Sequence, residues 1–234
     1  MTDPLRPRSE WGTIPWAPTT YGRSVLGAPL EVWKARAKCQ LLVFAGIHGE
    51  EPETTYALSR ALRQLREPPQ HCAVVLAANP DGLARGTRAN ARGVDLNRNF
   101  PAANWSPAPV TCRSTLQDPS DVLLSPGVHA GSEPEVQALL ALIAEMEPAT
   151  VVALHAPLAC IDDPGETRLG RWLAKRTRMP LVHDVGYPTP GSFGSWGKDR
   201  NLPIVTYEFP LAATEVLMHT HVPVLVELLL QPER

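Results

Sequence analysis

The sequence lacks the features that would assign it to a membrane, to a secretion route or to a nucleic acid. No apolar run approaches the ~20 residues that a membrane-spanning helix needs. The opening MTDPLRPRSEWGTIPW has no charged-then-apolar order typical of a signal peptide. The 22 Lys and Arg residues are balanced by 24 Asp and Glu residues and form no basic cluster. We therefore expect a cytoplasmic protein with neither membrane nor nucleic-acid partners; the sequence does not indicate its oligomeric state.

Paired cysteines, repeats and linkers are missing as well. The four cysteines form no CxxC motif and are expected to be buried thiols rather than a disulfide framework: Cys39, Cys72, Cys112 and Cys160. We find no internal repeat, low-complexity segment or interdomain linker. The 234 residues are enough for one large domain. We interpret 1–234 as a single domain whose segment 1–29, rich in Pro, Gly, Trp and Arg, is an irregular N-terminal arm.

Short apolar runs alternate with helical patterns along the chain. The runs predict strands at 30–33, 41–47, 73–78, 150–155, 181–185 and 203–209. The helical patterns cover about 53–66, 133–146, 166–178 and 213–230, the second with Ser132 and Glu135 placed as an S-x-x-E capping box. Several strands are apolar throughout, which suits a sheet buried on both faces. The fold class predicted is α/β, with a mixed, largely parallel central sheet flanked by helices.

Acidic and imidazole groups follow three of the expected strands. His48 and Glu51 lie in 46-GIHGEEPET-54, His155 closes 150-TVVALH-155, and Glu208 lies near the end of 203-PIVTYEF-209. Sites in open α/β sheets form beyond the carboxyl ends of strands. Two imidazoles and one carboxylate are a ligand set that catalytic zinc uses, with Glu208 as a spare carboxylate. The alternative is a polar turn before a helix and structural histidines, because H-x-x-E alone is a weak pattern.

The segment 79-NPDGLARGTRANARGVDLNRNFP-101 is rich in donors for an anion. It contains four arginines and three further asparagines: Arg85, Arg88, Arg92, Arg98, Asn90, Asn97 and Asn99. Guanidinium groups bind carboxylates through two parallel hydrogen bonds. The region 79–131 is too long for an idle connection. It is either part of a site or a solvated basic loop.

Together these motifs resemble the zinc carboxypeptidase family, which is carboxypeptidase A-like. The shared order is HxxE, NPDG, TRxN, GVDLNRNF, a histidine after an apolar strand, and TYEF, over about residues 40–210. Further runs resemble the family members that cut murein peptides in the bacterial cytoplasm, between γ-D-glutamate and meso-diaminopimelate: 21-YGRSVLGAPL-30, 86-GTRANARGVDLNRNFPAANW-105, 131-GSEPE-135, 155-HAPLACIDDP-164 and 186-GYPTPGSFGSWG-197. The resemblance implies a phosphorylase/hydrolase-like fold and a small murein peptide as substrate in cell-wall recycling.

The resemblance assigns the chemistry to particular residues. It implies one zinc ion bound by His48, Glu51 and His155, with Asp95 hydrogen-bonded to a zinc histidine. Glu208 matches the general base that takes a proton from the attacking water and passes it to the leaving amine. Arg88 matches the arginine that stabilises the oxyanion. The family also has a cis peptide bond where this chain has Ala156–Pro157.

The resemblance also implies how substrate is bound. Asn97 and Arg98 match the pair that binds the terminal carboxylate of the substrate. Thr206 matches the end of the pocket for the terminal side chain, and Ser192 lies in the loop expected to line it. Tyr187 lies where a mobile tyrosine covers the substrate, although its spacing to Gly191 differs by one from the digestive enzymes.

Diaminopimelate requires partners for a second ammonium and a second carboxylate. The candidates are the loop 187–197 and the residues after it, Lys198, Asp199 and Arg200. The loop 156–166 is expected to face the γ-D-glutamyl side. There Asp162, Asp163 and Glu166 either contact the L-alanine ammonium or form a solvated acidic loop.

Other functions remain possible at this point. One is another zinc carboxypeptidase or a deacylase of the aspartoacylase type, which would keep the fold. Another is a cell-wall peptide-binding protein without catalysis. A serine hydrolase is excluded, because 191-GSFGSWG-197 contains no G-x-S-x-G elbow.

Overall fold

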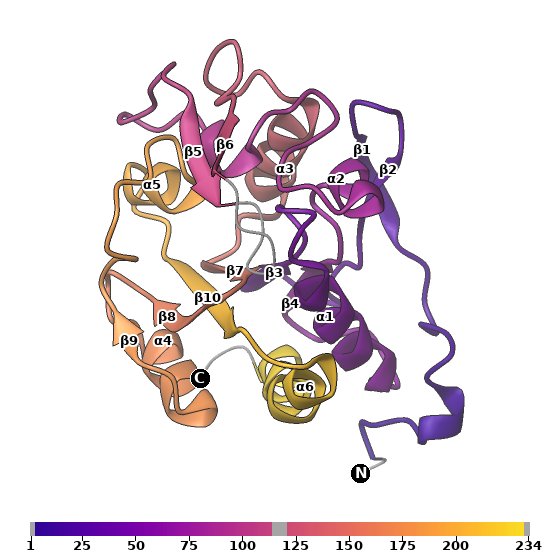
Figure 1. The fold of residues 1–234 in the computed structure, drawn as a ribbon. Coiled ribbons are helices and arrows are strands. Elements are labelled where there is room, and N and C mark those ends of the chain that lie inside the picture. Colours follow the sequence, from indigo (N-terminus) through magenta and orange to yellow (C-terminus); the bar gives the residue numbers. More distant parts are fainter. Residues whose placement is uncertain (1–2, 114–120, 232–234) are drawn as a thin grey trace.

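The computed structural model describes residues 3–113 and 121–231, and a six-stranded sheet lies at its centre (Figure 1). The strand order is β4-β3-β7-β10-β8-β9. The strands are β3 (Leu41–Phe44), β4 (Cys72–Val75), β7 (Thr150–His155), β8 (Leu158–Asp162), β9 (Leu181–Val182) and β10 (Ile204–Pro210). All neighbours pair in parallel except β8 and β10, which are antiparallel. The predicted mixed, largely parallel sheet is confirmed.

Helices cover both faces of the sheet and explain its unbroken apolar runs. On one face lie α1 (Pro52–Gln64), α4 (Arg168–Thr177) and α6 (Thr214–Leu230), and on the other lie α3 (Pro134–Met146) and α5 (Phe193–Lys198) (Figure 1). In β3, Leu41 and Val43 belong to the apolar cluster with α1 and α6, whereas Leu42 and Phe44 belong to the cluster with α3 and α5. Because successive side chains of a strand point to opposite faces, every position of β3 must be apolar.

No helix within the described ranges is long and apolar enough to cross a membrane.

Part of the N-terminal arm is regular, which corrects the prediction for 1–29. Strand β1 (Thr19–Arg23) pairs with β2 (Pro29–Val32) as an antiparallel hairpin. The hairpin is held from outside the segment, because Asp81 accepts hydrogen bonds from the Ser24 hydroxyl at 2.8 Å and from the Leu26 amide at 3.0 Å. A tertiary carboxylate therefore stabilises a strand whose own sequence carries a weak strand signal.

The segment 79–131 contains short elements that its sequence did not predict. They are α2 (Pro80–Arg85), a 3₁₀ turn η2 (Leu96–Arg98), and the hairpin of β5 (Val110–Arg113) and β6 (Asp121–Leu124). The expected capping box of α3 is wrong. Pro134 takes the first helical position, so Glu133 is the N-cap and Ser132 donates to the Glu133 carboxylate at 2.7 Å.

Candidate metal centre and active site

A cleft of about 790 Å³ lies beyond the carboxyl ends of β3, β7 and β10. His48 enters it from the turn after β3, His155 is the last residue of β7, and Glu208 lies near the end of β10. Because the parallel strands end at one edge of the sheet, these three groups meet although they are far apart in the sequence.

His48, Glu51 and His155 form a buried cluster with the geometry of a metal site. The Glu51 carboxylate lies between the two imidazoles, with Oε1 2.7 Å from His48 Nδ1 and Oε2 3.2 Å from His155 Nδ1. One ligand atom from each residue lies within 4.8 Å of the other two. Burial raises the pKa of Glu51, but the imidazoles lower it by more, so its net pKa lies well below the usual range and the carboxylate stays ionised. Two imidazole nitrogens and an ionised carboxylate around one point fit a zinc ion.

The NPDG segment explains the turn that carries His48. Asn79 caps α2 by accepting from the Gly82 amide at 2.9 Å, and its side-chain amide donates to the Ile47 carbonyl at 3.1 Å. A Cβ on Gly49 would lie 2.0 Å from the carbonyl carbon of Gly82. Only glycine therefore allows the His48 turn to pack this closely on α2.

Asp95 orients His48 from the side opposite Glu51. Its Oδ1 lies 3.2 Å from His48 Nε2 and accepts from the Asn97 amide at 2.9 Å, and the residue is 1% exposed. Burial raises the pKa of Asp95, but Arg88 and then His48 lower it well below its usual range, so the residue is a carboxylate. A carboxylate at Nε2 holds the proton there and leaves the Nδ1 lone pair for a metal.

Arg88 links the acids around this cluster. Its Nε donates to Asp95 Oδ2 at 2.9 Å, and one terminal nitrogen lies 3.4 Å from Glu50 Oε1 and 3.6 Å from Glu51 Oε1. Glu50 is therefore an ion-pair partner of Arg88. The local sequence around Glu50 does not indicate this pair, because Arg88 lies 38 residues away along the chain.

Glu208 is buried, yet its carboxylate belongs to the cleft. It is 6% exposed, and its Oε2 accepts a long hydrogen bond of 3.4 Å from the Leu158 amide. Burial raises the pKa of Glu208 above its usual value, and the neighbouring His155 offsets this only in part. A carboxylate that is easier to protonate than usual is suited to accept and return a proton.

Arg98 is an unpaired cation in the wall of the cleft. It is 7% exposed, its Nε has no hydrogen-bond partner in the described residues, and a terminal nitrogen donates to the Asn97 carbonyl at 2.7 Å. None of the ion pairs of the described residues includes it. Asn97 also lines the cleft, with Oδ1 accepting from the Phe193 amide at 2.9 Å. A buried guanidinium without a carboxylate is costly unless an anionic ligand binds there.

The other expected substrate residues also reach the cleft. Thr206, Tyr187 and Ser192 line it, Tyr187 being 50% exposed, and Ser192 also caps α5 by accepting from the Ser195 amide. Of the charged residues that follow the loop, only Lys198 lines the cleft. Asp199 accepts from the Ala103 amide, and Arg200 lies over the Trp196 ring at 4.7 Å.

Several expected donors serve the fold instead. Asn90 donates to Glu133 and Glu135, and Asn99 donates to the carbonyls of Pro126 and His129. Arg92 pairs with Glu133 at 3.6 Å, and Arg85 does not line the cleft. The arginine-rich segment is thus neither a solvated loop nor wholly a binding site.

The segment 156–166 differs from the expected loop. Residues Leu158–Asp162 form β8, and the Ala156–Pro157 bond is cis, as predicted. Asp163 is buried and accepts from the Gly165 amide and from the amide and hydroxyl of Thr167, so it is neither solvated nor available to a ligand.

Glu166 is exposed and lies 3.2 Å from His183, which lines the cleft. Of the acids of this segment, only Asp162 lines the cleft. His183, Asp184 and Cys112 line it too. Sequence reasoning assigned none of these three to the site. Their own sequences carry no local signal for it, because strand pairing and loop packing bring them there.

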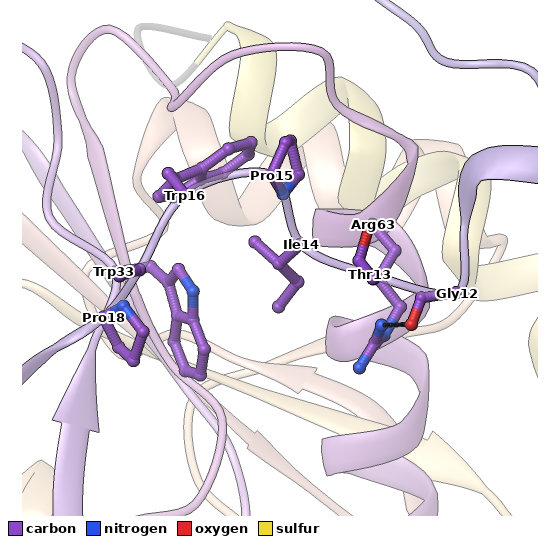
Figure 2. A pocket seen from close by; sticks show the side chains of 9 residues that line it. Gly12, Thr13, Ile14, Pro15, Trp16, Pro18, Trp33 and Arg63 are labelled. Atoms are coloured by element: carbon purple, nitrogen blue, oxygen red, sulfur yellow. Dashed lines mark hydrogen bonds between the residues drawn. The ribbon is translucent and has the colours of Figure 1, made fainter.

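A second hollow, of about 480 Å³, lies between the N-terminal arm and α1 and is lined by Trp16, Trp33 and Arg63 among others (Figure 2). Arg63 is its one charged lining residue, and a terminal nitrogen of its guanidinium donates to the Gly12 carbonyl at 2.7 Å. This hollow offers no group for acid–base or metal chemistry.

Comparisons with known proteins agree with this geometry. The family described as zinc carboxypeptidase matches residues 17–161. Murein peptide amidase A of Escherichia coli (strain K12) is 51% identical over 209 residues, covering 88% of this chain and 86% of that protein. Murein peptide amidase A of Vibrio campbellii is 42% identical over 235 residues, covering 98% of this chain and 94% of that protein.

Two structures show the range of the fold. A crystal structure of a murein-tripeptide amidase from Escherichia coli O157 superposes with a TM-score of 0.92 at 46% identity, covering 97% of this chain and 98% of that one. Bovine thrombin-activatable fibrinolysis inhibitor superposes with a TM-score of 0.68 at 18% identity, covering 91% and 88%. The second likeness concerns the fold alone.

Proposed function

This chain belongs to the zinc carboxypeptidase family, and from that premise we propose that it is a zinc-dependent murein peptide amidase. Its substrate is L-Ala-γ-D-Glu-meso-diaminopimelate, and it hydrolyses the bond between γ-D-glutamate and diaminopimelate. The observation that carries the proposal is one cleft that holds three convergent metal-ligating groups, the buried acid Glu208 and the unpaired cation Arg98. The relatives named murein peptide amidase A support the substrate class.

His48, Glu51 and His155 would hold one zinc ion. When bound there, zinc supplies a Lewis acid that polarises the scissile carbonyl and makes water more acidic. Asp95 keeps the proton of His48 on Nε2 and so presents Nδ1 as the ligand atom.

Arg98 and Asn97 bind the terminal carboxylate of diaminopimelate. The unpaired guanidinium gains its partner when this carboxylate enters the cleft. A peptide without a free carboxylate leaves Arg98 buried and unpaired, so it binds poorly. Binding of the terminal carboxylate at Arg98 therefore selects the C-terminal residue of a peptide and positions the last amide bond near Glu208.

Glu208 carries the proton of the reaction. Its carboxylate takes a proton as water adds to the γ-carbonyl carbon, and it gives that proton to the amine of diaminopimelate as the C–N bond breaks. Burial raises the pKa of Glu208, which makes its carboxylate a stronger base than an exposed glutamate and so favours proton uptake from water. Arg88, which lines the same cleft, donates to the developing oxyanion, and Tyr187 at the rim covers bound substrate.

The cytoplasm is the compartment we propose. The four cysteines, of which Cys39, Cys72 and Cys160 are buried, are all free thiols, which suits a reducing environment. A deacylase of another class and a binding protein without catalysis are not favoured. The amidase relatives cover most of the chain, and all three metal-ligating groups and the acid lie in the cleft.

The test is a product analysis. Zinc-loaded protein is incubated with L-Ala-γ-D-Glu-meso-diaminopimelate, with its α-linked isomer, and with the tripeptide amidated at its terminal carboxylate. Mass spectrometry should find free diaminopimelate and L-Ala-γ-D-Glu from the first peptide only. Absence of both products from the first peptide would overturn the proposed function.

A further inference from the structure

Asp162 lies in the floor of the cleft, beside the strand that carries the proposed base. In the antiparallel pairing of β8 with β10, Asp162 is the partner of Thr206, and Cys160 is the partner of Glu208. Partners across a ladder point to the same face of a sheet. Asp162 and Thr206 therefore lie one step below Glu208, deeper under the carboxyl edge, and both line the cleft. On β10, Tyr207 lies between Thr206 and Glu208. Its side chain points to the opposite face and is fully buried in the core.

The Asp162 carboxylate has no partner within the described part of the chain. Its Oδ1 is buried and accepts no hydrogen bond, and none of the ion pairs in residues 3–113 and 121–231 includes it. Lys198 lines the same cleft without pairing with it. Burial, together with the carboxylates of Asp184 and Asp163, raises the pKa of Asp162 to about 6, although His155 lowers it in part. An ionised group in this position is destabilised until a cation reaches it.

The neighbouring acids Asp163 and Asp184, unlike Asp162, accept hydrogen bonds from the protein. Asp163 uses its carboxylate on the amides of Gly165 and Thr167. Asp184 is exposed and accepts from the Gly186 amide at 2.7 Å. Asp162 is thus the one acid of this group that is partly buried, unpaired and part of the cleft floor.

The residues that share the cleft with Asp162 indicate what it binds. Arg98, Glu208, Thr206 and Asp162 line one cleft, so a terminal residue whose carboxylate binds at Arg98 and whose amide bond lies at Glu208 can extend its side chain to Thr206 and Asp162. We propose that Asp162 binds an ammonium group at the end of that side chain and thereby selects a diamino acid, an inference that rests on the proposed function. In diaminopimelate this is the second ammonium. An uncharged side chain, or one that carries only a carboxylate, leaves Asp162 unpaired or adds repulsion.

The test compares two tripeptides that differ only in this ammonium. L-Ala-γ-D-Glu is joined to meso-diaminopimelate in one and to 2-aminopimelate, which lacks the second amino group, in the other. The readout is the ratio of their kcat/KM values for wild type and for Asp162→Asn. We expect wild type to prefer the diamino peptide by at least about 30-fold, the effect of one buried charge pair. The ratio should fall toward one in the variant. The control Glu145→Gln removes the charge of an exposed acid on α3 that does not line the cleft, and it should keep the wild-type ratio.

A binding measurement needs no turnover. Calorimetry with free meso-diaminopimelate and with free 2-aminopimelate should show the same preference in wild type and its loss in Asp162→Asn. If wild type cleaves both peptides with a ratio that Asp162→Asn leaves unchanged, the inference is overturned and the proposed function stands. If zinc-loaded wild type cleaves neither peptide, the proposed function fails, and the inference fails with it.

Discussion

Glu208 and His155 are direct partners in the register of the parallel strands β10 and β7. Their side chains therefore leave the same face of the sheet one strand spacing apart, roughly 4.8 Å between backbones. This pairing places a buried acid beside an imidazole of the proposed metal centre without help from any loop. Both residues lie on neighbouring strands, so the sheet itself sets the spacing between the proposed proton carrier and the proposed metal centre.

Replacing a ligand should remove the metal. His155→Ala deletes one of three converging donors, so we expect its zinc content after dialysis to fall from one ion per chain to near zero. Metal analysis by plasma mass spectrometry measures this. The matched control is His183→Ala, a histidine of the same cleft outside the ligand cluster, which should keep its zinc. Equal zinc content in the His155→Ala variant and the wild type would contradict the assigned ligand set.

Asp95 should tune the metal centre without binding the metal. In Asp95→Asn the carboxylate that accepts from His48 Nε2 becomes a neutral amide. We expect zinc affinity to fall by about 10- to 100-fold, the usual effect of removing such a partner. Competition with a chromophoric chelator measures the affinity. An unchanged affinity would show that the Glu51 side alone orients His48.

Arg98 should select a free terminal carboxylate. Its guanidinium is buried and unpaired, so Arg98→Met loses the anion partner while keeping most of the side-chain volume. We expect kcat/KM for the free tripeptide to fall by about 100-fold or more, while kcat/KM for the amidated peptide changes little. Arg85→Met, an exposed arginine of the same segment outside the cleft, serves as the control. A preserved ratio between free and amidated peptides in Arg98→Met would refute this role.

The Asp162 carboxylate should lower the free energy of unfolding at neutral pH, because it is charged there and has no partner until a ligand binds. Its folded-state pKa of about 6 lies above the 3.8 of an ordinary aspartate, so between these values the folded state binds more protons than the unfolded state. Stability therefore falls as pH rises through this window, and the full cost is present at pH 7.5. After discounting for solvent in the cleft, Asp162→Asn should be about 1–2 kcal/mol more stable at pH 7.5. It should have no such advantage at pH 3.5.

Denaturant unfolding of both proteins at the two pH values measures this difference. If Asp162→Asn is less stable than wild type at pH 7.5, the Asp162 carboxylate has a structural partner and is not unpaired in the free protein.

The local motifs carried most of the site in the sequence. His48 and Glu51 lie three residues apart on one turn, and Asn97 and Arg98 are neighbours, so short-range geometry brings each pair into the cleft together. Asp95 lies just before them and contacts His48 from behind the cleft. The alternation of apolar runs and helical patterns also predicted the fold class, because β3 is buried on both faces. These features depend little on distant parts of the chain.

Contacts between segments that are far apart in the sequence determine the features that the local sequence does not predict. Strand β8 is short, follows a proline and has Ala159 at a φ of 57°, so the run 158-LACID-162 gives no clear strand pattern. Without β8, nothing distinguishes Asp162, which faces the cleft, from Asp163, which is used within the fold. The same limit applies to Glu50, whose partner Arg88 comes from another segment, and to β1, which Asp81 helps to hold.

The most direct test of the account is the rate of diaminopimelate release by Glu208→Gln. Both proteins are loaded with zinc, and one ion per chain is verified before L-Ala-γ-D-Glu-meso-diaminopimelate is added. If Glu208 moves the proton beside an intact metal centre, the variant keeps its zinc and its kcat falls by about 100- to 10,000-fold. A fully zinc-loaded Glu208→Gln protein that releases diaminopimelate at the wild-type rate would contradict the account.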